Sequence, residues 1–505
     1  MLAKCALLVA ALGAFFLAGS RNIEGNPPLW WDEGWTLSVA RNWLEQGHYG
    51  LFLSGQPCPP TLAAHFPVVA ATAFSFHLFG VGIWQGRIVG VILTAVALAL
   101  IFELTRRLYS RKVAFATLAI LLLCPAEWYI HPLHMGRQVI GETHLIAWTL
   151  AGYLFFLLFP RRPYLYMPLA VVSWAVALLT KDQILPFWLA SVGAPVALLS
   201  LKRQWRRVGV IVVVSIASLL VWRLLNIGRH ALLTSHITQS APILGLTDVS
   251  AMVFVPSIRR AALRFSVYSM FPALAGLLFA LGKFVRSEAK GTPFDHPAAV
   301  RLMLFALTAS WMFWFIAASI GWPRYAFPIV FLAAPFVAFM LFDLTKGLNA
   351  SASGKALLAM IRTKTFDSGV LGVITAIILI VLMCKKGVAD YSHFSESISD
   401  RSAESVATFL NNETPQDSEI ETYESELLFL LQRRYHFPPP QLNVDFIRRN
   451  WHDPNAPLQY DTSTITAEYL VVGKFGKEVY APLTESGRYQ LLRAFGPYEV
   501  YRRAR

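Results

Sequence analysis

The sequence predicts a polytopic α-helical membrane protein with a small α/β domain at its C-terminal end. The 505 residues are 55% hydrophobic and only 15% charged, with a mean hydropathy of +0.50. Soluble domains contain about 25% charged residues, so an ordinary soluble enzyme and a disordered chain are excluded. Residues 1–386 carry 32 Lys and Arg against 13 Asp and Glu, whereas residues 387–505 carry 12 against 17. A cationic membrane region therefore precedes a mildly acidic tail, a distribution that argues against nucleic-acid binding.

About eleven apolar stretches are long enough to cross the hydrocarbon core, which takes about 17–25 residues. They lie near residues 3–19, 87–104, 113–130, 142–159, 164–180, 183–200, 208–225, 268–282, 302–320, 326–342 and 369–384. Alternate loops hold most of the Lys and Arg residues, and the positive-inside rule places those loops in the cytoplasm. The N-terminus then starts in the cytoplasm and the tail lies outside. The last crossing is the least supported, because Lys385 and Lys386 follow it on the outer side.

The first outer loop, about residues 20–86, contains two stretches that we expect to lie along the membrane surface. Within residues 34–48, the stretch from Thr36 to Gly47 has the periodicity of an amphipathic helix that a glycine ends. Residues 66–84 are apolar, but a crossing here would invert every later loop and place Arg106 and Arg107 outside. An interfacial or re-entrant helix therefore explains this stretch better than a span.

The two chain ends and the cysteines complete the predicted organisation. Residues 2–19 are also compatible with a cleaved signal peptide, although the many following spans favour a retained first helix. In the tail, residues 403–412 read as a short helix, and residues 419–424, 469–475 and 498–503 have strand-like alternation. We therefore expect a membrane domain over residues 1–386 and an extracytoplasmic α/β domain over residues 387–505. The four cysteines, Cys5, Cys58, Cys124 and Cys384, show no CxxC spacing and predict no disulfide framework.

Ionisable residues gather at one depth, the outer membrane boundary, once the topology is assigned. Asp32 and Glu33 follow the first span at the start of the amphipathic helix, where free N–H groups favour a carboxylate. The other outer residues are His65, His131, His134, Arg137, Glu142, Lys181, Asp182, Arg324 and Tyr325. Such groups are expensive at the membrane edge and usually face a cavity. A helix cap would explain Asp32 and Glu33 alone, and snorkelling would explain a lone Lys or Arg, but neither explains a cluster that includes carboxylates and histidines.

The cluster suits an anionic, lipid-tailed ligand together with a deprotonated acid. It predicts no metal site, because His131 and His134 at i,i+3 lack a third ligand at a defined spacing. Cofactor use is left unknown, with a divalent metal as an alternative that the spacing does not indicate.

Several motifs in a fixed order resemble the family 39 glycosyltransferases of the GT-C superfamily, which include protein O-mannosyltransferases and the lipid A aminoarabinose transferase. They are DEGWTLSVARNWLEQGHYG after the first span, the HFP segment followed by QGRIVGVIL, the TRRLYSRKVA and HMGRQVIGET turns, ALLTKDQILPF and WPRYAFPIVFLAAP. The resemblance covers roughly residues 1–345. It implies a hexosyl- or pentosyltransferase that moves a monosaccharide, with inversion, from a polyprenyl-phosphate carrier to an acceptor hydroxyl outside the cytoplasm.

The resemblance also implies roles for individual residues. Asp32 would be the general base, and Glu33, its neighbour in the same motif, is the second expected catalytic residue. Arg137 and Lys181 would contact the lipid phosphate, and Glu142 takes the place of the acid in the same turn as Arg137. Arg324 and Tyr325 match an RY motif near the sugar or the phosphate. His65 stands where the aminoarabinose transferase has a Lys-Pro-Pro motif. We expect it to bind the substrate, because a histidine can hydrogen-bond a phosphate or help bind a metal, although it is not a permanent cation at pH 7.

The implied partners are the lipid-linked sugar donor, an envelope acceptor that is a glycan, lipid or protein, and the bilayer of a bacterial cytoplasmic (inner) membrane. One alternative is a transporter or flippase for a lipid-linked sugar. Such a protein would carry functional polar groups near the middle of the membrane, where this chain is nearly free of charge. A second alternative is an assembly protein whose tail recruits a partner, which leaves the acidic and basic turns unexplained. The donor sugar, the acceptor, the role of the tail and the oligomeric state stay open.

Overall fold

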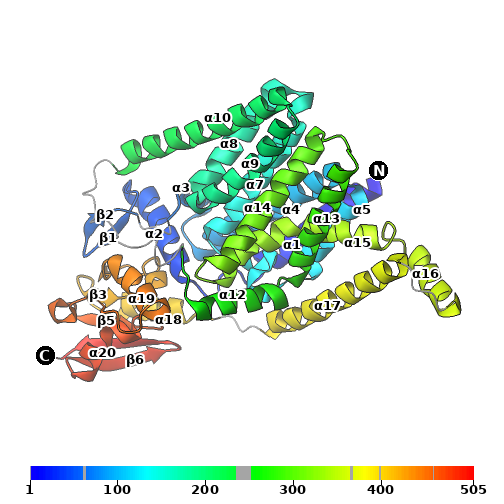
Figure 1. Cartoon of the computed structure of the whole chain (residues 1–505). Helices are drawn as coiled ribbons and strands as arrows, with labels where there is room; N and C mark the ends of the chain where they lie inside the picture. Colours follow the sequence, from blue (N-terminus) through cyan, green and yellow to red (C-terminus); the bar gives the residue numbers. More distant parts are fainter. Residues whose placement is uncertain are drawn as a thin grey trace.

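A computed structural model describes residues 2–60, 64–124, 126–234, 252–363, 368–396, 400–458 and 460–504 (Figure 1). A helix overlaps each of the eleven predicted spans. These helices are α1 (Leu2–Ser20), α4 (Ile83–Leu108), α5 (Arg111–Leu123), α7 (Gly141–Leu158), α8 (Pro163–Thr180), α9 (Leu185–Leu201), α10 (Trp205–Arg229), α13 (Phe271–Ala289), α14 (His296–Ala317), α15 (Phe327–Leu344) and α17 (Ser368–Glu396).

Fewer than eleven of these helices meet the length needed to cross a membrane alone. Within the described residues, eight helical segments are long and apolar enough, and the pair α12 (Pro256–Tyr268) and α13, bent by 78°, makes up to nine. The apolar part of α1, Ala6–Ser20, is shorter, and α5 has 13 residues. The polytopic helical fold is therefore confirmed, but the number of crossings stays a prediction.

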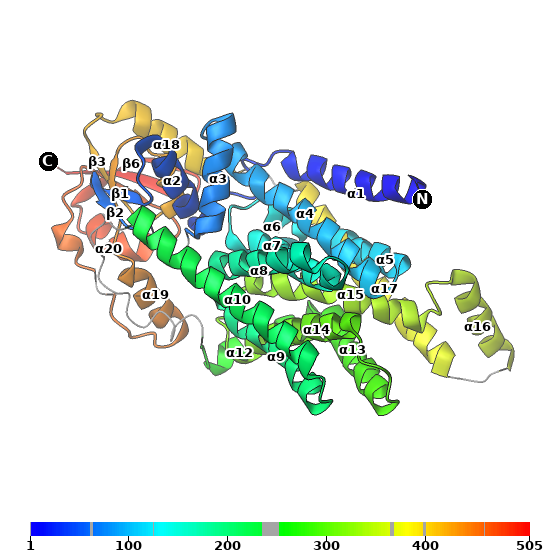
Figure 2. The ribbon, with the colours of Figure 1, turned by 90° about the horizontal axis from the view of Figure 1, so that it is seen from above.

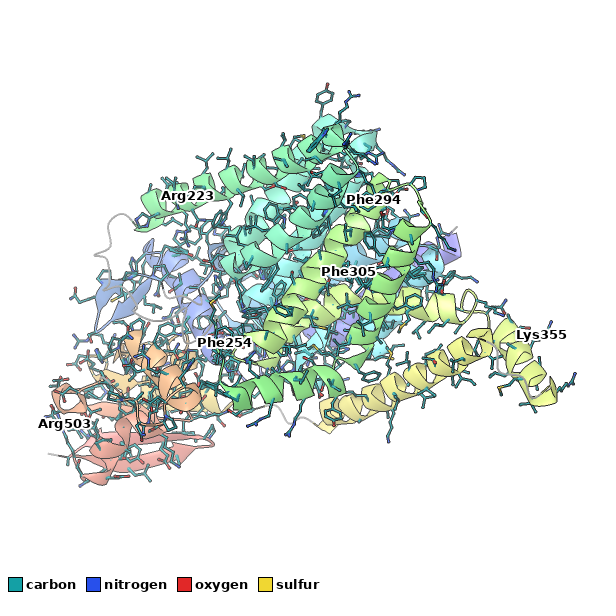
Figure 3. The ribbon with its side chains drawn as sticks, in the orientation of Figure 1. Arg223, Phe254, Phe294, Phe305, Lys355 and Arg503 are labelled. Carbon is teal, nitrogen blue, oxygen red and sulfur yellow. The ribbon has the colours of Figure 1, made fainter. Side chains whose placement is uncertain are left out.

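The helices α7 and α15 form the centre of the bundle. About 78% of the most apolar stretch is buried in each of them, against 22% in α10 and α17, which lie at the periphery. α7 packs against α4 and α8, and α15 packs against α13 and α5. Side chains fill the space between the helices, as around Phe305 on α14, whereas Arg223 on α10 and Lys355 on α16 (Ala350–Thr363) extend from the bundle surface (Figure 3).

The first loop forms two helices and a hairpin at one end of the bundle. The helices are α2 (Trp31–Gln46) and α3 (Phe66–Phe79), and the hairpin pairs β1 (Leu51–Leu53) with β2 (Gln56–Cys58). α3 has 14 residues, which at about 1.5 Å per residue span roughly 21 Å. That length is below the ~30 Å of the hydrocarbon core, as expected for a helix that does not cross.

The C-terminal residues that the structure describes form a mixed five-stranded sheet with three helices. The strand order is β4 (Arg434–His436), β3 (Glu419–Thr422), β5 (Tyr469–Val472), β7 (Tyr498–Arg503) and β6 (Tyr489–Phe495). β3 runs parallel to both β4 and β5, whereas β7 is antiparallel to β5 and β6. The helices are α18 (Ser402–Glu413), α19 (Gln441–Trp451) and α20 (Lys477–Glu485). The small α/β domain expected from the tail is therefore present.

The domain lies at one end of the bundle, and the α4–α5 turn and α16 lie at the other end (Figure 2). α17 continues to Glu396, beyond the expected boundary at residue 386, and leads the chain back toward the C-terminal domain. The basic α4–α5 turn, which the sequence predicts to be cytoplasmic, is thus far from this domain.

The C-terminal domain and the first loop share one hydrophobic core. Trp31 makes edge contacts with the rings of Tyr423, Phe437 and Phe475, at centroid distances of 4.8, 5.8 and 4.6 Å. The Ser425 hydroxyl donates to the Trp31 carbonyl oxygen over 2.7 Å. A Cβ on Gly34 would lie 2.0 Å from the Ser425 carbonyl oxygen. Helix α2 therefore touches the domain with its backbone, and only glycine fits at position 34.

Gly34→Ala should weaken the docking of the C-terminal domain. The added methyl group meets backbone, which moves less easily than a side chain, and such overpacking typically costs about 1–3 kcal/mol. We expect a lower thermal midpoint of the detergent-solubilised protein and faster proteolytic release of the domain. Gly209→Ala on α10 is the matched control, because a Cβ there meets nothing within 4 Å. Equal midpoints for the two variants would contradict this packing.

Candidate active site

Five segments bring ionisable side chains together where the bundle meets α2 and α3. Asp32 lies in the first turn of α2, and Glu142 lies in the first turn of α7. Lys181 ends α8, Arg324 lies in the short helix η5 (Pro323–Ala326), and His65 precedes α3. Each residue lies in or next to the first or last turn of a helix, where the chain turns. Side chains from distant parts of the sequence therefore meet at one level.

The ion pairs form a continuous chain of alternating charge. Lys181 Nζ lies 2.6 Å from Glu142 Oε1, and Arg324 Nε lies 4.0 Å from the same carboxylate oxygen. Arg324 also donates through Nη1 to Asp32 Oδ2. The order is thus Asp32, Arg324, Glu142, Lys181.

Exposure differs along this chain. The Glu142 side chain is 3% exposed and that of Lys181 is 13% exposed, against 22% for Asp32 and 20% for Arg324. The Asp32–Arg324 end is therefore the more accessible to a ligand.

Aromatic rings border the two cations. Lys181 Nζ lies 5.3 Å from the centroid of the Tyr325 ring, and Arg324 Cζ lies 5.4 Å from the same ring. The Trp322 ring lies 5.0 Å from Arg324 Cζ. These are cation–π distances, so the turn that supplies Arg324 also supplies rings that orient both cations.

His65 and Lys181 both pack against Gly141. A Cβ on Gly141 would lie 3.3 Å from His65 Cδ2 and 3.5 Å from Lys181 Cγ and Cδ. Burial, with a further contribution from the Lys181 charge, lowers the pKa of His65 to about 4. His65 is therefore a neutral imidazole near pH 7, able to donate or accept a hydrogen bond but not to act as a cation.

Glu33, the acid next to Asp32, points elsewhere. Its carboxylate is fully buried and pairs with the fully buried Arg87, with 2.6 Å from Arg87 Nη2 to Oε2 and 2.9 Å from Arg87 Nε to Oε1. The backbone N–H groups of Trp30 and Val139 donate to the same carboxylate. Glu33 thus anchors the start of α2 to α4 and is separated from the ion-paired chain.

Arg137 is also placed away from the ion-paired chain. Its guanidinium donates to the carbonyl oxygens of Ala18, Gly19, Arg21 and Asn26, over 2.5 to 3.3 Å. It therefore caps the C-terminal end of α1. The structure brings together Asp32, Glu142, Lys181, Arg324, Tyr325 and His65 of the predicted site residues, whereas the Glu33 side chain pairs with Arg87 and that of Arg137 donates to carbonyl oxygens at the end of α1.

Sequence reasoning missed Arg87 and Trp322. Arg87 lies at the start of a predicted span, where an arginine requires a buried partner. The carboxylates of the preceding loop could therefore have been predicted as its partners. Trp322 precedes Arg324 by two residues in the WPRY motif. The sequence does not indicate which aromatic ring packs against the guanidinium.

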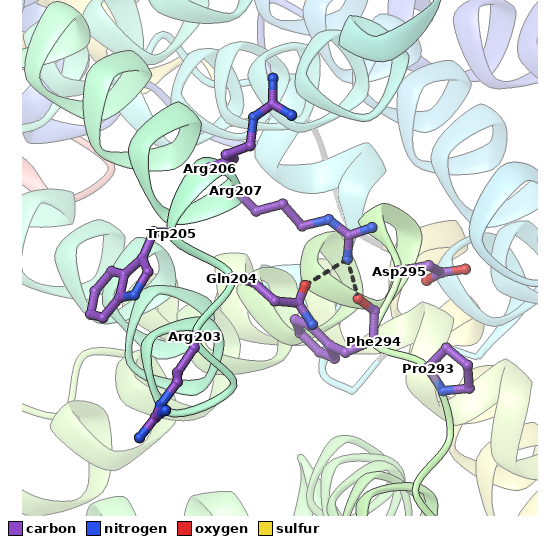
Figure 4. Close-up of a pocket in the computed structure, with 8 residues that line it drawn as sticks. All are labelled: Arg203, Gln204, Trp205, Arg206, Arg207, Pro293, Phe294 and Asp295. Carbon is purple, nitrogen blue, oxygen red and sulfur yellow. Dashed lines mark hydrogen bonds between the residues drawn. The ribbon is translucent and has the colours of Figure 1, made fainter.

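No metal centre is evident among the ion-paired residues that the structure describes. Within the described ranges, no three His, Cys, Asp or Glu side chains gather closely enough to hold a metal ion. An open hollow of about 630 Å³ lies elsewhere, lined by Arg203, Trp205, Arg206, Pro293 and Asp295 among others (Figure 4). It lies beside the C-terminal end of α9, whereas Lys181 precedes the N-terminal end of this helix. Arg207 closes one side of it by donating to the Phe294 carbonyl oxygen over 2.6 Å.

Comparison with solved structures defines the class of fold. ArnT from Cupriavidus metallidurans, bound to undecaprenyl phosphate, matches with a TM-score of 0.58 and 15% identity over 98% of this chain and 97% of that chain. The oligosaccharyltransferase AglB from Archaeoglobus fulgidus, in complex with an inhibitory peptide and a dolichol-phosphate, matches with a TM-score of 0.56 and 13% identity over 99% and 75%. The fold of this chain is therefore similar to that of ArnT and AglB.

A family model matches part of the sequence. Residues 64–227 match the family model described as dolichyl-phosphate-mannose-protein mannosyltransferase. The search of curated proteins found no match. The resemblance to GT-C glycosyltransferases of the mannosyltransferase and ArnT type, expected from the motifs, is confirmed, and the chain is a multi-pass membrane protein.

Glu33→Gln should destabilise the protein. Removing one partner of a fully buried pair leaves an uncompensated charge on Arg87, which typically costs about 3–5 kcal/mol. We expect a large fall in the thermal midpoint of the purified protein. Asp32→Asn is the matched control, because it changes the adjacent, partly exposed acid in the same way and should leave the midpoint nearly unchanged. A small effect of Glu33→Gln would contradict the anchoring role.

His65 should make the protein less stable in acid. Its folded-state pKa of about 4 lies below the unfolded value of 6.5, so between these pH values only the unfolded chain takes up the proton. Stability therefore falls as the pH drops from 6.5 toward 4, and His65→Gln should make this fall shallower. Thermal midpoints at pH 7.5, 5.5 and 4.5 measure the slope. His77→Gln, at an exposed position of α3, controls for loss of an imidazole; equal slopes for wild type and His65→Gln would refute the assignment.

Proposed function

We propose that the chain is an inverting glycosyltransferase that moves a monosaccharide from a polyprenyl-phosphate carrier to an acceptor hydroxyl on the outer face of a bacterial cytoplasmic membrane. The observation that carries this proposal is the row of ion-paired side chains Asp32–Arg324–Glu142–Lys181, which lies at the junction of the bundle with α2. It combines cations that suit a lipid phosphate with a carboxylate that suits proton transfer. The undecaprenyl phosphate bound to ArnT and the dolichol-phosphate bound to AglB support a carrier of this class.

The orientation in the membrane follows from charge. The loops at the end opposite the C-terminal domain include the basic α4–α5 turn with Arg106, Arg107 and Lys112. The positive-inside rule assigns that end to the cytoplasm. The C-terminal domain and the ion-paired chain are then extracytoplasmic, at the depth of an outer-leaflet phosphate.

Lys181 and Arg324 are the proposed phosphate-binding cations. Positive groups held in place at a developing anion stabilise the transition state without reorganising, and an arginine fork matches a phosphate in two hydrogen bonds. Arg137, although expected in this role from the motif, already donates to four backbone carbonyl oxygens. Arg324 is therefore the better candidate for the second cation.

Asp32 is the proposed general base. In the reaction, the acceptor hydroxyl oxygen bonds to the anomeric carbon while its proton passes to Asp32, and the bond from that carbon to the phosphate oxygen breaks. The electron pair leaves with the lipid phosphate. Glu142 is nearly buried and holds Lys181, so its proposed role is to position that cation, and Glu33 is a positioning residue for α2.

Asp32→Asn should lose transfer and keep donor binding. Loss of a general base typically lowers the rate about 10²–10⁴-fold. Purified wild type and variant would be incubated with a panel of polyprenyl-phosphate monosaccharides and membrane extract. The readout is free polyprenyl phosphate together with sugar on a new species.

Three controls make this experiment decisive. An unchanged thermal midpoint of Asp32→Asn excludes misfolding. Lys181→Met should instead weaken donor binding, because it removes a phosphate contact. Near-normal turnover by Asp32→Asn would refute its role as base, and tight binding of one donor by wild type without any release would favour a transporter.

A further inference from the structure

Two of the four cysteines meet at the end of the bundle that carries the C-terminal domain. Cys124 follows the last residue of α5, and Cys384 lies in α17. Their Sγ atoms are 4.0 Å apart although 260 residues separate them in sequence. Cys384 is exposed and Cys124 is partly buried, so a reagent can reach the pair.

The surroundings hold these two helices together at this level. Lys386 Nζ lies 2.5 Å from Glu127 Oε1, and the Ser269 hydroxyl donates to the same carboxylate. A Cβ on Gly387 would lie 2.3 Å from the Leu123 carbonyl oxygen, so α17 approaches the end of α5 through its backbone. The ion pair also accounts for Lys386, which fitted the positive-inside rule poorly.

Elsewhere, α17 is held weakly. Only 22% of its most apolar stretch is buried, and its contacts with the bundle are mainly to α15. The buried side chains Ala376 and Met383 pack against Val337, Met340 and Leu341 of α15, with Cys124 at the edge of this cluster. The turn that contains Cys384 and Gly387 is therefore the place where this peripheral helix is fixed to the end of α5.

We propose that Cys124 and Cys384 are oxidised to a disulfide that fastens α17 to α5. The two thiols lose two protons and two electrons, one S–S bond forms, and the disulfide of an extracytoplasmic thiol oxidoreductase accepts the electrons and becomes a dithiol. The sulfurs must approach to about 2.05 Å, and the outer face of a bacterial membrane is an oxidising environment. The inference uses the proposed orientation, but it does not depend on glycosyl transfer.

The bond would fix α17 to α5 at a point twelve residues before α17 ends at Glu396. α18 of the C-terminal domain is the next helix along the chain, so fixing α17 would restrict the segment that precedes this domain. A cross-link over such a long loop restricts the unfolded chain strongly. The expected consequence is a higher thermal midpoint of the oxidised form.

Thiol counting on protein from intact cells tests the proposal. Cells that express a Cys5→Ser/Cys58→Ser chain are quenched with acid, so that thiols are neither oxidised nor exchanged during lysis. The chain is then denatured in SDS and treated with a maleimide-polyethylene glycol, with and without prior reduction. We expect no added tag without reductant and two tags with it. Mass spectrometry should then find the two cysteine-containing peptides linked in the unreduced sample.

Single variants control the count, and stability supplies a second readout. Cys124→Ser and Cys384→Ser in the same background should each accept one tag whether or not reductant is present. Reductant should lower the thermal midpoint of the parent to that of the Cys124→Ser/Cys384→Ser chain and leave the latter unchanged. Two tags on the unreduced parent, or a linkage between two copies of the chain, would overturn the proposal.

Discussion

The buried pair between Glu33 and Arg87 is the interaction on which the site depends. Both side chains are fully desolvated, which is tolerable only because every charged atom finds a partner. The Arg87 guanidinium donates hydrogen bonds to Glu33 and to four carbonyl oxygens of residues 23–28. The Glu33 carboxylate also accepts a hydrogen bond from the backbone N–H of Val139. One ion pair thus fixes the first loop, the start of α2, α4 and the segment that leads to α7. The position of Asp32 follows from that of its neighbour.

The C-terminal domain supplies the second constraint on the same helix. Gly34 lies against the backbone of Ser425, and Arg41 donates from its Nη1 atom to the Phe429 carbonyl oxygen over 2.6 Å. Helix α2 is therefore held by α4 on one side and by the domain on another, and Asp32 turns toward Arg324. The C-terminal domain therefore helps to hold α2, and with it Asp32, in place at the candidate site.

Much of the architecture could be predicted from the sequence, because long apolar runs and strand alternation are local signals. The bend between α12 and α13 and the strands β4 and β6 were missed. β4 has only three residues, and β6, although it has seven, is a mostly exposed strand at the edge of the sheet. Side-chain direction was harder still. Asp32 and Glu33 are adjacent and chemically alike, yet about 100° of helical rotation per residue sends one into the ion-paired chain and the other to Arg87. Arg137 lies in a matching motif, but only the folded chain reveals that α1 ends beside it.

The charge balance of the ion-paired chain indicates which carboxylate would yield to a ligand. Its two carboxylates match its two cations, so an incoming lipid phosphate must compete with a carboxylate for a cation. Glu142 is 3% exposed and lies near both Lys181 and Arg324, and its release would leave a buried charge without a partner. Asp32 is 22% exposed, and among the four ion-paired residues it pairs with Arg324 alone. Under the proposed reaction, phosphate binding at Arg324 would therefore release Asp32, and donor binding itself would produce the free base that the acceptor needs.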